Sequence, residues 1–213
     1  WLGEIPAHWE VRRMAMAAVK ITNGYVGPTR DILVNDGVRY LQSLHIKQGL
    51  IDFERHPYFV TPEWSDNHEK SVLAEGDVLI VQTGEIGQVA VVTNEFAGCN
   101  CLALIIVRLK RNLGVGQWLA SALQSDYGQG ALTWSQTGAL HPHLECGHVR
   151  EIRVAIPPAS EQVVILKRLT SALDLLDRQV AKVRDAIDRL KELRAALISA
   201  AVTGKIDVRE ELA

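Results

Sequence analysis

The most regular hydrophobic pattern of the chain lies near its C-terminal end, where apolar residues recur at alternating steps of three and four positions. That spacing is typical of the seam of a coiled-coil helix. It predicts one helix from Ser160, as N-terminal cap, to about Val202, with Gly204 ending it. At about 1.5 Å per residue the helix would be roughly 60–65 Å long. Its seam consists of Leu166, Leu169, Leu173, Leu176, Val180, Val183, Ile187, Leu190 and Leu197, with Arg194 interrupting the pattern.

A seam of this length has to be covered, because exposed apolar surface is unfavourable in water. The sequence predicts no second helix of matching length, so we expect the covering helix to come from a second copy or from another part of a longer polypeptide. The alternative is an amphipathic helix packed on the chain's own N-terminal part, but such helices usually run about 8–20 residues. The sequence opens on Trp1 rather than Met, which suggests a fragment or a trimmed chain.

Residues 1–158 carry shorter apolar runs broken by glycines, a pattern that indicates strands. Val78–Val81 and Val89–Thr93 flank a glycine-containing turn and predict a β-hairpin. The apolar run at 101–107 predicts a further strand.

Two more elements complete the predicted N-terminal domain. Apolar residues at helical spacing between 116 and 128 predict a short helix that stops at Gly128. Ile152, Val154 and Ile156 alternate as in a strand, which runs into Pro157 and Pro158. We therefore predict an α+β protein: a mixed α/β domain with a β-rich core at 1–158, then a long coiled-coil helix and tail at 159–213.

Composition and charge restrict the function. The chain is 47% hydrophobic and 23% charged, as in a soluble globular protein, and no run reaches the ~20 apolar residues of a membrane span. Its three cysteines are too few for a disulfide framework and favour a reducing cytoplasm. The net charge is −2, with −3 on residues 1–158 and +1 on the rest. DNA binding would therefore need locally clustered positive groups or a partner that supplies them.

Five segments of the chain stand out together: "GEIPAHWEV" (3–11), "LAEGDVLIVQTGEIGQVAVV" (73–92), "TGALHPHL" (137–144), "IRVAIPPASEQ" (152–162) and "LISAAVTGKIDVR" (197–209). In this order and spacing they resemble the DNA-specificity subunit of Type I restriction–modification enzymes. The resemblance implies one half of such a subunit. It further implies that a full subunit has two target-recognition domains, each reading one half of a split DNA site, and two long helices that pack antiparallel as a spacer. Methyltransferase subunits, and through them the restriction subunit, would dock on that spacer.

The sequence gives no sign of catalysis. It lacks a glycine-rich phosphate loop, a methyltransferase cofactor motif and a nuclease carboxylate cluster, so we expect a non-catalytic protein without a cofactor. Two alternatives stay open: a coiled-coil assembly protein whose head binds protein, and a zinc-dependent enzyme. The residue types would suit zinc but their spacing fits no standard site. They are Cys99, Cys101, His141, His143, Cys146 and His148.

Residues able to read bases or to hold phosphates concentrate in three loop-rich segments. In the last of these we expect Trp134 to anchor the loop against the core, and we expect Trp9, Trp64 and Trp118 to be core or domain-packing aromatics rather than platforms for base stacking. Two basic residues after a predicted strand are further candidates for phosphate contact. The candidates are Ser43, His45, Lys47 and Gln48; Gln82, Thr83 and Gln88; Lys110 and Arg111; and Thr133, Ser135, Gln136, Thr137, His141 and His143.

Overall fold

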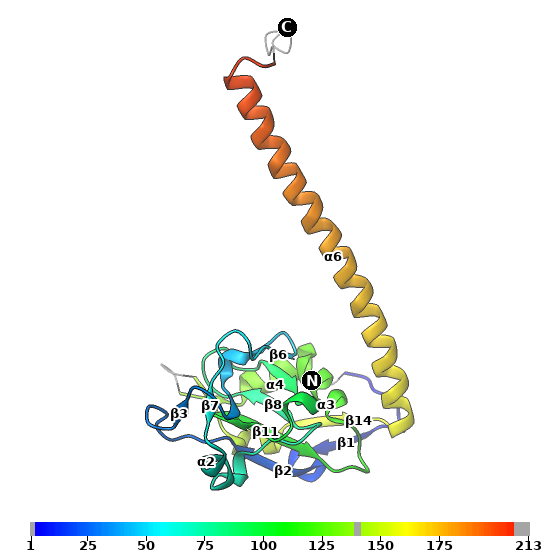
Figure 1. Cartoon of the computed structure of the whole chain (residues 1–213). Helices are drawn as coiled ribbons and strands as arrows, with labels where there is room; N and C mark the ends of the chain where they lie inside the picture. Colours follow the sequence, from blue (N-terminus) through cyan, green and yellow to red (C-terminus); the bar gives the residue numbers. More distant parts are fainter. Residues whose placement is uncertain (1–2, 139–141, 207–213) are drawn as a thin grey trace. The chain divides into compact units, whose positions relative to one another are not determined.

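The predicted strands come together in a computed structural model, which describes residues 3–138 and 142–206. The central sheet has four antiparallel strands in the order β2 (Ala18–Asn23), β11 (Leu104–Leu109), β8 (Val78–Val81) and β9 (Val89–Val91) (Figure 1). The hairpin predicted from the glycine-containing turn is confirmed as β8 and β9. The α+β fold class is confirmed as well.

Both faces of this sheet are buried, which is why its strands read as continuous apolar runs rather than as an alternation. Side chains of β8 alternate between the two faces: Val78 and Ile80 enter one core, and Leu79 and Val81 enter the other. The first core also takes residues from four helices, α1 (Met14–Ala17), α3 (Gly116–Gln124), α4 (Asp126–Trp134) and α5 (Cys146–Glu151).

The second core lies against a smaller sheet with the order β10–β4–β7–β3. Three two-stranded sheets, β1–β14, β5–β6 and β12–β13, add to the frame. The strands are β1 (Glu10–Arg13), β3 (Leu33–Val34), β4 (Val38–Leu41), β5 (Ile46–Lys47), β6 (Leu50–Ile51), β7 (Phe59–Val60), β10 (Asn100–Cys101), β12 (Gln136–Thr137), β13 (His143–Leu144) and β14 (Arg153–Ile156). Short helical turns are α1 (Met14–Ala17), α2 (Pro62–Asp66) and the 3-10 turns Ser43–His45, Glu69–Ser71 and Asn94–Phe96.

Two sequence predictions were wrong in detail. The apolar run at 101–107 is not one strand, because Ala103 takes a positive φ of 48° and the chain passes there from the small sheet to the central one. The helix predicted to stop at Gly128 ends at Gln124 instead. The Ser125 hydroxyl accepts the Gly128 N–H and starts a second helix, so Gly128 lies inside α4.

The chain divides into two units, residues 1–163 and 164–213, whereas the sequence places the domain boundary between 158 and 159. The difference arises because the first turn of the long helix α6 (Ala159–Val202) belongs to the first unit. Buried Gln162 donates to the carbonyls of Leu113 and Pro157 and accepts the N–H of Val115.

The N-terminal segment of the first unit contacts the same turn. Glu161 accepts hydrogen bonds from His8 and from the indole of Trp9, and these bonds lower the pKa of its carboxyl group. Trp9 packs edge-on against Trp118, whose indole donates to the Ala155 carbonyl. Trp9 and Trp118 are therefore packing residues, as predicted.

Helix α6 is 44 residues long, or about 66 Å at 1.5 Å per residue. It begins at Ala159, directly after Pro158, so the predicted cap at Ser160 was wrong. Gly204 ends it as predicted, with a φ of 69° and with the N–H groups of Gly204 and Lys205 returning to the carbonyls of Ala201 and Ala200.

The apolar stripe of α6 is open to solvent over most of its length. From Leu169 to Leu197 every predicted seam residue is exposed, with exposed fractions from 38% at Leu169 to 65% at Leu190. Only Leu166, near the start of the stripe, is half-buried. None of the described helices is long and apolar enough to cross a membrane.

Candidate nucleic-acid interface

The three loop-rich segments predicted to contact DNA meet at one end of the central sheet. Residues 82–88, the turn between β8 and β9, lie between the other two segments and are called the hairpin tip below. On one side the amide nitrogen of Gln82 donates to Nε2 of His143 at 2.9 Å, and the Leu144 N–H donates to the Gln82 carbonyl at 3.0 Å. The ribbon formed by β12 and β13 is thereby attached to the hairpin tip.

On the other side the hairpin tip holds the β5–β6 hairpin. The N–H of Gln48 donates to Oε1 of Gln88 at 3.0 Å, and both β5 and β6 contact β9. Gln48 and Gly49 form the two-residue turn of this hairpin with φ values of 51° and 84°. Positive φ at both positions is what a tight hairpin turn requires, and for a residue other than glycine it is uncommon.

The candidates in these segments differ in how far they reach solvent. Four side chains are exposed, six are half-buried, and two are buried. His141 lies outside the described residues. The exposed ones are Lys47, Gln48, Thr83 and Thr133; the half-buried ones are Ser43, Gln88, Ser135, Gln136, Thr137 and His143; the buried ones are His45 and Gln82.

The structure places His45 in the core, where its side chain cannot reach a base. The Gln42 N–H donates to Nδ1 at 2.8 Å, so Nε2 carries the proton and donates to the His56 carbonyl at 2.8 Å. Burial lowers the pKa of the His45 imidazole, because the charged form loses its hydration. His45 therefore fixes the path of residues 55–56 instead of reading a base. Sequence reasoning missed this because a histidine in a polar segment carries no signal of burial.

Gln82 is also buried, with 3% of its surface exposed, and its Oε1 atom has no hydrogen-bond partner within residues 3–138 and 142–206. Its amide group holds His143 and its backbone holds Leu144. These contacts make Gln82 a residue that positions the ribbon rather than one that faces a ligand.

Lys110 and Arg111 lie away from the three segments. Strand β11 pairs with β8 so that Leu104 is opposite Val81 and Val107 is opposite Val78. The hairpin tip follows Val81, so residues 110–111, which follow β11, are at the other end of the sheet. Arg111 there lines a separate pocket together with Glu75.

The expectation for Trp134 was wrong. Its side chain is 91% exposed at the end of α4, so it does not anchor the following loop in the core. The Ser135 hydroxyl donates to the Ala131 carbonyl and holds the end of the helix instead. Trp64 is half-buried, and its ring stacks on His68 with 3.9 Å between ring centroids.

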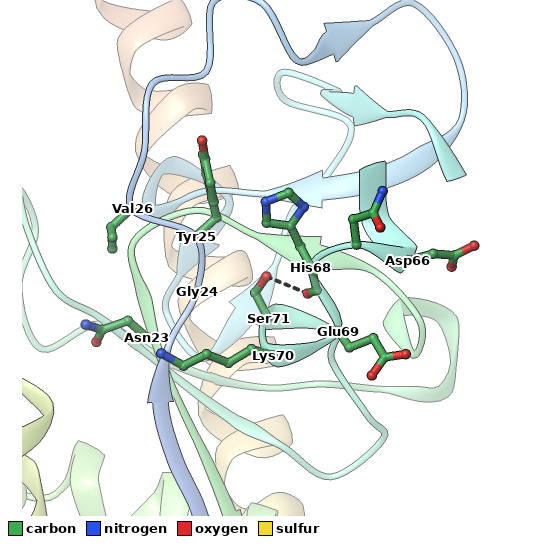
Figure 2. A pocket seen from close by; sticks show the side chains of 10 residues that line it. Asn23, Gly24, Tyr25, Val26, Asp66, His68, Glu69, Lys70 and Ser71 are labelled. Carbon is green, nitrogen blue, oxygen red and sulfur yellow. Dashed lines mark hydrogen bonds between the residues drawn. The ribbon is translucent and has the colours of Figure 1, made fainter. Parts of the chain in front are cut away.

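His68 and its neighbours line a pocket of about 550 Å³. Figure 2 shows Lys70 extending toward Asn23, while Asp66 and Glu69 lie on the other side of His68. The lining combines two carboxylates with a single lysine, a balance that does not favour an anion.

The zinc alternative finds no support among residues 3–138 and 142–206, where no three His, Cys, Asp or Glu side chains gather as a metal site would require. Cys99 and Cys101 are buried, and burial raises the pKa of the Cys99 thiol to about 11. The Cys146 thiol donates to Oδ1 of Asn23 at 2.8 Å. His141, one of the residues proposed for zinc, lies outside the described part of the chain.

A second hollow, of about 310 Å³, lies between the β5–β6 region and the hairpin tip. It is called the basic hollow below. Arg55 and His56 contribute to it, although sequence reasoning did not single them out. The pair lies in a polar stretch whose sequence gives no sign that it folds back beside residues 43–47. The lining residues are Ser43, Leu44, Ile46, Lys47, Arg55, His56 and Glu85.

Comparisons with known proteins agree with this architecture. Residues 9–185 match a family model described as the Type I restriction modification DNA specificity domain. The chain is 22% identical over 183 residues to the Type I restriction enzyme EcoBI specificity subunit of Escherichia coli, covering 86% of this chain and 38% of that protein.

Solved structures share the fold. The HsdS subunit from Thermoanaerobacter tengcongensis superposes with a TM-score of 0.66 at 21% identity, covering 93% of this chain and 50% of that one. A chain from a structure of the type I R-M system, solved to explain complex assembly and conformational transition, gives 0.67 at 19% identity, with coverage of 93% and 47%. The chain thus spans half or less of the length of these relatives.

Proposed function

Because this chain belongs to the family of Type I restriction modification DNA specificity domains, we propose that its first unit reads one half of a bipartite site in duplex DNA. The observation that carries the proposal is the meeting of three polar segments at one end of the central sheet. Gln82 connects the hairpin tip to His143, and Gln88 connects it to Gln48. One rigid hairpin thereby sets the spacing between the other two segments.

The exposed side chains at this end offer the chemistry that base edges need. Gln48 presents an amide, which can donate and accept at adenine, and Lys47 presents the ammonium group that suits guanine or a phosphate. Thr83 and Thr133 add hydroxyl groups that suit several bases. Reading on a rigid frame favours specificity, since little conformational freedom is lost on binding.

The second unit supports a spacer role. Its exposed apolar stripe requires a covering helix, which we assign to the second half of a longer polypeptide or to a second copy of this chain. A strut of about 66 Å spans nearly two turns of B-DNA, whose helical repeat is about 34–36 Å. Two heads on such a strut can read two half-sites at a fixed distance, which a flexible linker would not maintain.

The same helix offers a surface for the methyltransferase subunits, and through them for the restriction subunit. Its solvent face alternates basic and acidic side chains such as Arg178, Lys182 and Asp185. With a net charge of −2, this chain does not supply the positive field of a typical DNA-binding protein. In this proposal the chain provides recognition without catalysis, and its methyltransferase partners provide much of the phosphate contact.

Filter binding with and without methyltransferase subunits tests the proposal. The duplex probe should carry the methylated site found by methylome sequencing of cells that contain the intact system. We expect weak, strongly salt-dependent binding by the chain alone and tight, site-selective binding by the assembly. An assembly that binds the site no better than a scrambled duplex would contradict the proposal and favour a head that binds protein.

A matched pair of variants links binding to the proposed surface. Gln48→Ala removes an exposed amide at the meeting point, whereas Gln117→Ala removes an exposed amide from α3. Only Gln48→Ala should reduce the preference of the assembly for the site over the scrambled duplex, roughly tenfold if one bidentate base contact is lost.

A further inference from the structure

The basic hollow concentrates positive charge in a chain whose net charge is −2. Lys47 and Arg55 face it together with His56, and Glu85 of the hairpin tip is the one acidic residue in its lining. All four of these side chains are exposed. The hydroxyl-bearing Ser43 also lines the hollow. Lysine, arginine and serine are the side chains that proteins use to hold phosphate oxygens.

The two cations of the basic hollow are available for a ligand. None of the six ion pairs between described residues involves Lys47 or Arg55. By contrast, Arg39 pairs with Glu95 and Arg108 pairs with Asp77. Lys47 and Arg55 therefore lie in a concave surface without an ion-pair partner among the described residues, whereas Arg39 and Arg108 are neutralised by a carboxylate.

The frame under the basic hollow is fixed by buried groups. His45, which is fully buried, donates to the His56 carbonyl and so holds residues 55–56 beside the turn at 43–45. The Asp52 N–H donates to the His45 carbonyl at 2.8 Å and closes the loop between them. The His45 ring also packs against Phe53, with 5.4 Å between ring centroids. Arg55 and Lys47 are therefore brought together by the core rather than by chance on a loose surface.

We propose that the basic hollow is a subsite for a backbone phosphate of the DNA that the first unit reads, with Lys47 and Arg55 as its cationic contacts. This inference rests on the proposed function. DNA is the ligand that the location favours, because the lining shares residues with two of the meeting segments: Ser43 and Lys47 with the segment that ends at Gln48, and Glu85 with the hairpin tip. A phosphate held there fixes the register of the duplex against the base-reading side chains.

Salt dependence measures this contact directly, because log Kobs falls with log salt concentration and each lost phosphate contact makes this negative slope shallower by about 0.9. Arg55→Gln and Lys47→Gln should each make the slope shallower by about that amount, with the methyltransferase-bound full chain as the sample. The affinity loss should be roughly eightfold at 0.1 M salt and should vanish toward 1 M, equally for site-bearing and scrambled duplexes. Arg55→Lys should restore the slope, since it restores the charge.

The matched control is Lys70→Gln. Lys70 is an exposed lysine that lines the pocket of Figure 2 beside Asp66 and Glu69. Its substitution by glutamine should leave the slope of log Kobs against log salt concentration unchanged. Glu85→Gln should act in the opposite direction and raise the affinity for scrambled duplex, because it removes the acidic group from the lining. Urea unfolding of each variant checks that these exposed substitutions leave the fold intact.

The outcomes separate this inference from the proposed function. If the wild-type assembly binds its site but Arg55→Gln and Lys47→Gln keep the wild-type slope, the phosphate subsite is wrong and the reading function stands. If the wild-type assembly does not bind, the proposed function itself fails. Titrations with ATP and with inorganic phosphate at matched ionic strength form the last arm. One result would overturn the proposal and assign the hollow to a free anion. In that result ATP or inorganic phosphate binds, Arg55→Gln abolishes this binding, and the same substitution leaves the salt dependence of DNA binding unchanged.

Discussion

The amide nitrogen of Gln82 donates to Nε2 of His143 at 2.9 Å and joins the hairpin tip to the ribbon that follows α4. The other amide atom of Gln82, Oε1, is buried and has no partner among the described residues. The two residues are therefore unequal: His143 is half-buried and can bond water, whereas the one side-chain hydrogen bond that Gln82 makes within the described residues is the bond to His143.

The difference in burial between Gln82 and His143 predicts which of their variants is the less stable. His143→Leu leaves the whole Gln82 amide buried and unpaired, which should cost about 1–3 kcal/mol. Gln82→Met removes the amide and its unpaired oxygen together, so it should change the free energy of unfolding by less than about 1 kcal/mol. The double variant should recover most of the loss. Urea denaturation measures all three, and a larger loss in Gln82→Met than in His143→Leu would contradict the assignment.

Removal of the Gln162 side-chain amide should lower the free energy of unfolding by more than the substitutions at Gln82 and His143 do. Its three hydrogen bonds attach the first turn of α6 to Leu113, Val115 and Pro157. Gln162→Ala would leave these backbone groups without partners and should destabilise the first unit by about 2–4 kcal/mol. Gln117→Ala, on the exposed face of α3, is the control and should stay within about 0.5 kcal/mol of the wild type in the same urea titrations. An equal effect of the two substitutions would show that the turn is held by other contacts.

The ion pair between Asp77 and Arg108 predicts that removing one partner destabilises the protein more than removing the other. Both carboxylate oxygens of Asp77 accept from Arg108, at 2.6 and 2.8 Å, and Asp77 is fully buried while Arg108 is partly open to solvent. Arg108→Met would leave a buried carboxylate without its counter-charge, and we expect a loss of about 3–5 kcal/mol. Asp77→Asn should cost less, because Arg108 can turn to water. Thermal unfolding of both variants at neutral pH gives the order, and the reverse order would contradict this account.

His45 predicts that stability falls in mild acid. Burial lowers the pKa of its imidazole, so the unfolded chain takes up a proton at a higher pH than the folded chain does. The favourable contribution of neutral His45 is therefore complete above about pH 6.5 and is lost as the pH falls from there toward the folded-state pKa. Urea titrations between pH 7.5 and 5 should show a slope that His45→Gln reduces. A slope identical in the two proteins would assign the acid sensitivity to other groups.

The sequence predicted those elements whose signal is local. The heptad stripe predicted the long helix α6, and the glycines of the turn after Val81 predicted the β8–β9 hairpin. The three loop segments could be chosen as candidates because their polar residues are concentrated, and the structure brings all three together.

Other features depended on long-range contacts that a local pattern cannot reveal. Gln82 looks like a solvent-facing polar residue in the sequence, and only its partner His143, far along the chain, explains its burial. The break at Ala103 arises because two sheets share one apolar run. His45 and Arg55 were misjudged for another reason: their partners His56 and Lys47 are near in the sequence, but the stretch between them carries no periodic pattern that shows how the chain folds back.

The pairing of β1 with β14 has a consequence for how the first unit forms. Glu10 pairs with Ile156 and Arg13 with Arg153, so almost the entire unit lies between the two strands. During synthesis β1 cannot pair until β14 has left the ribosome. Such non-local pairing slows folding, because a long loop must close before the contact gives any stabilisation. The first unit therefore has an unpaired strand edge while it is being synthesised, and chaperone binding at this stage would protect it from aggregation.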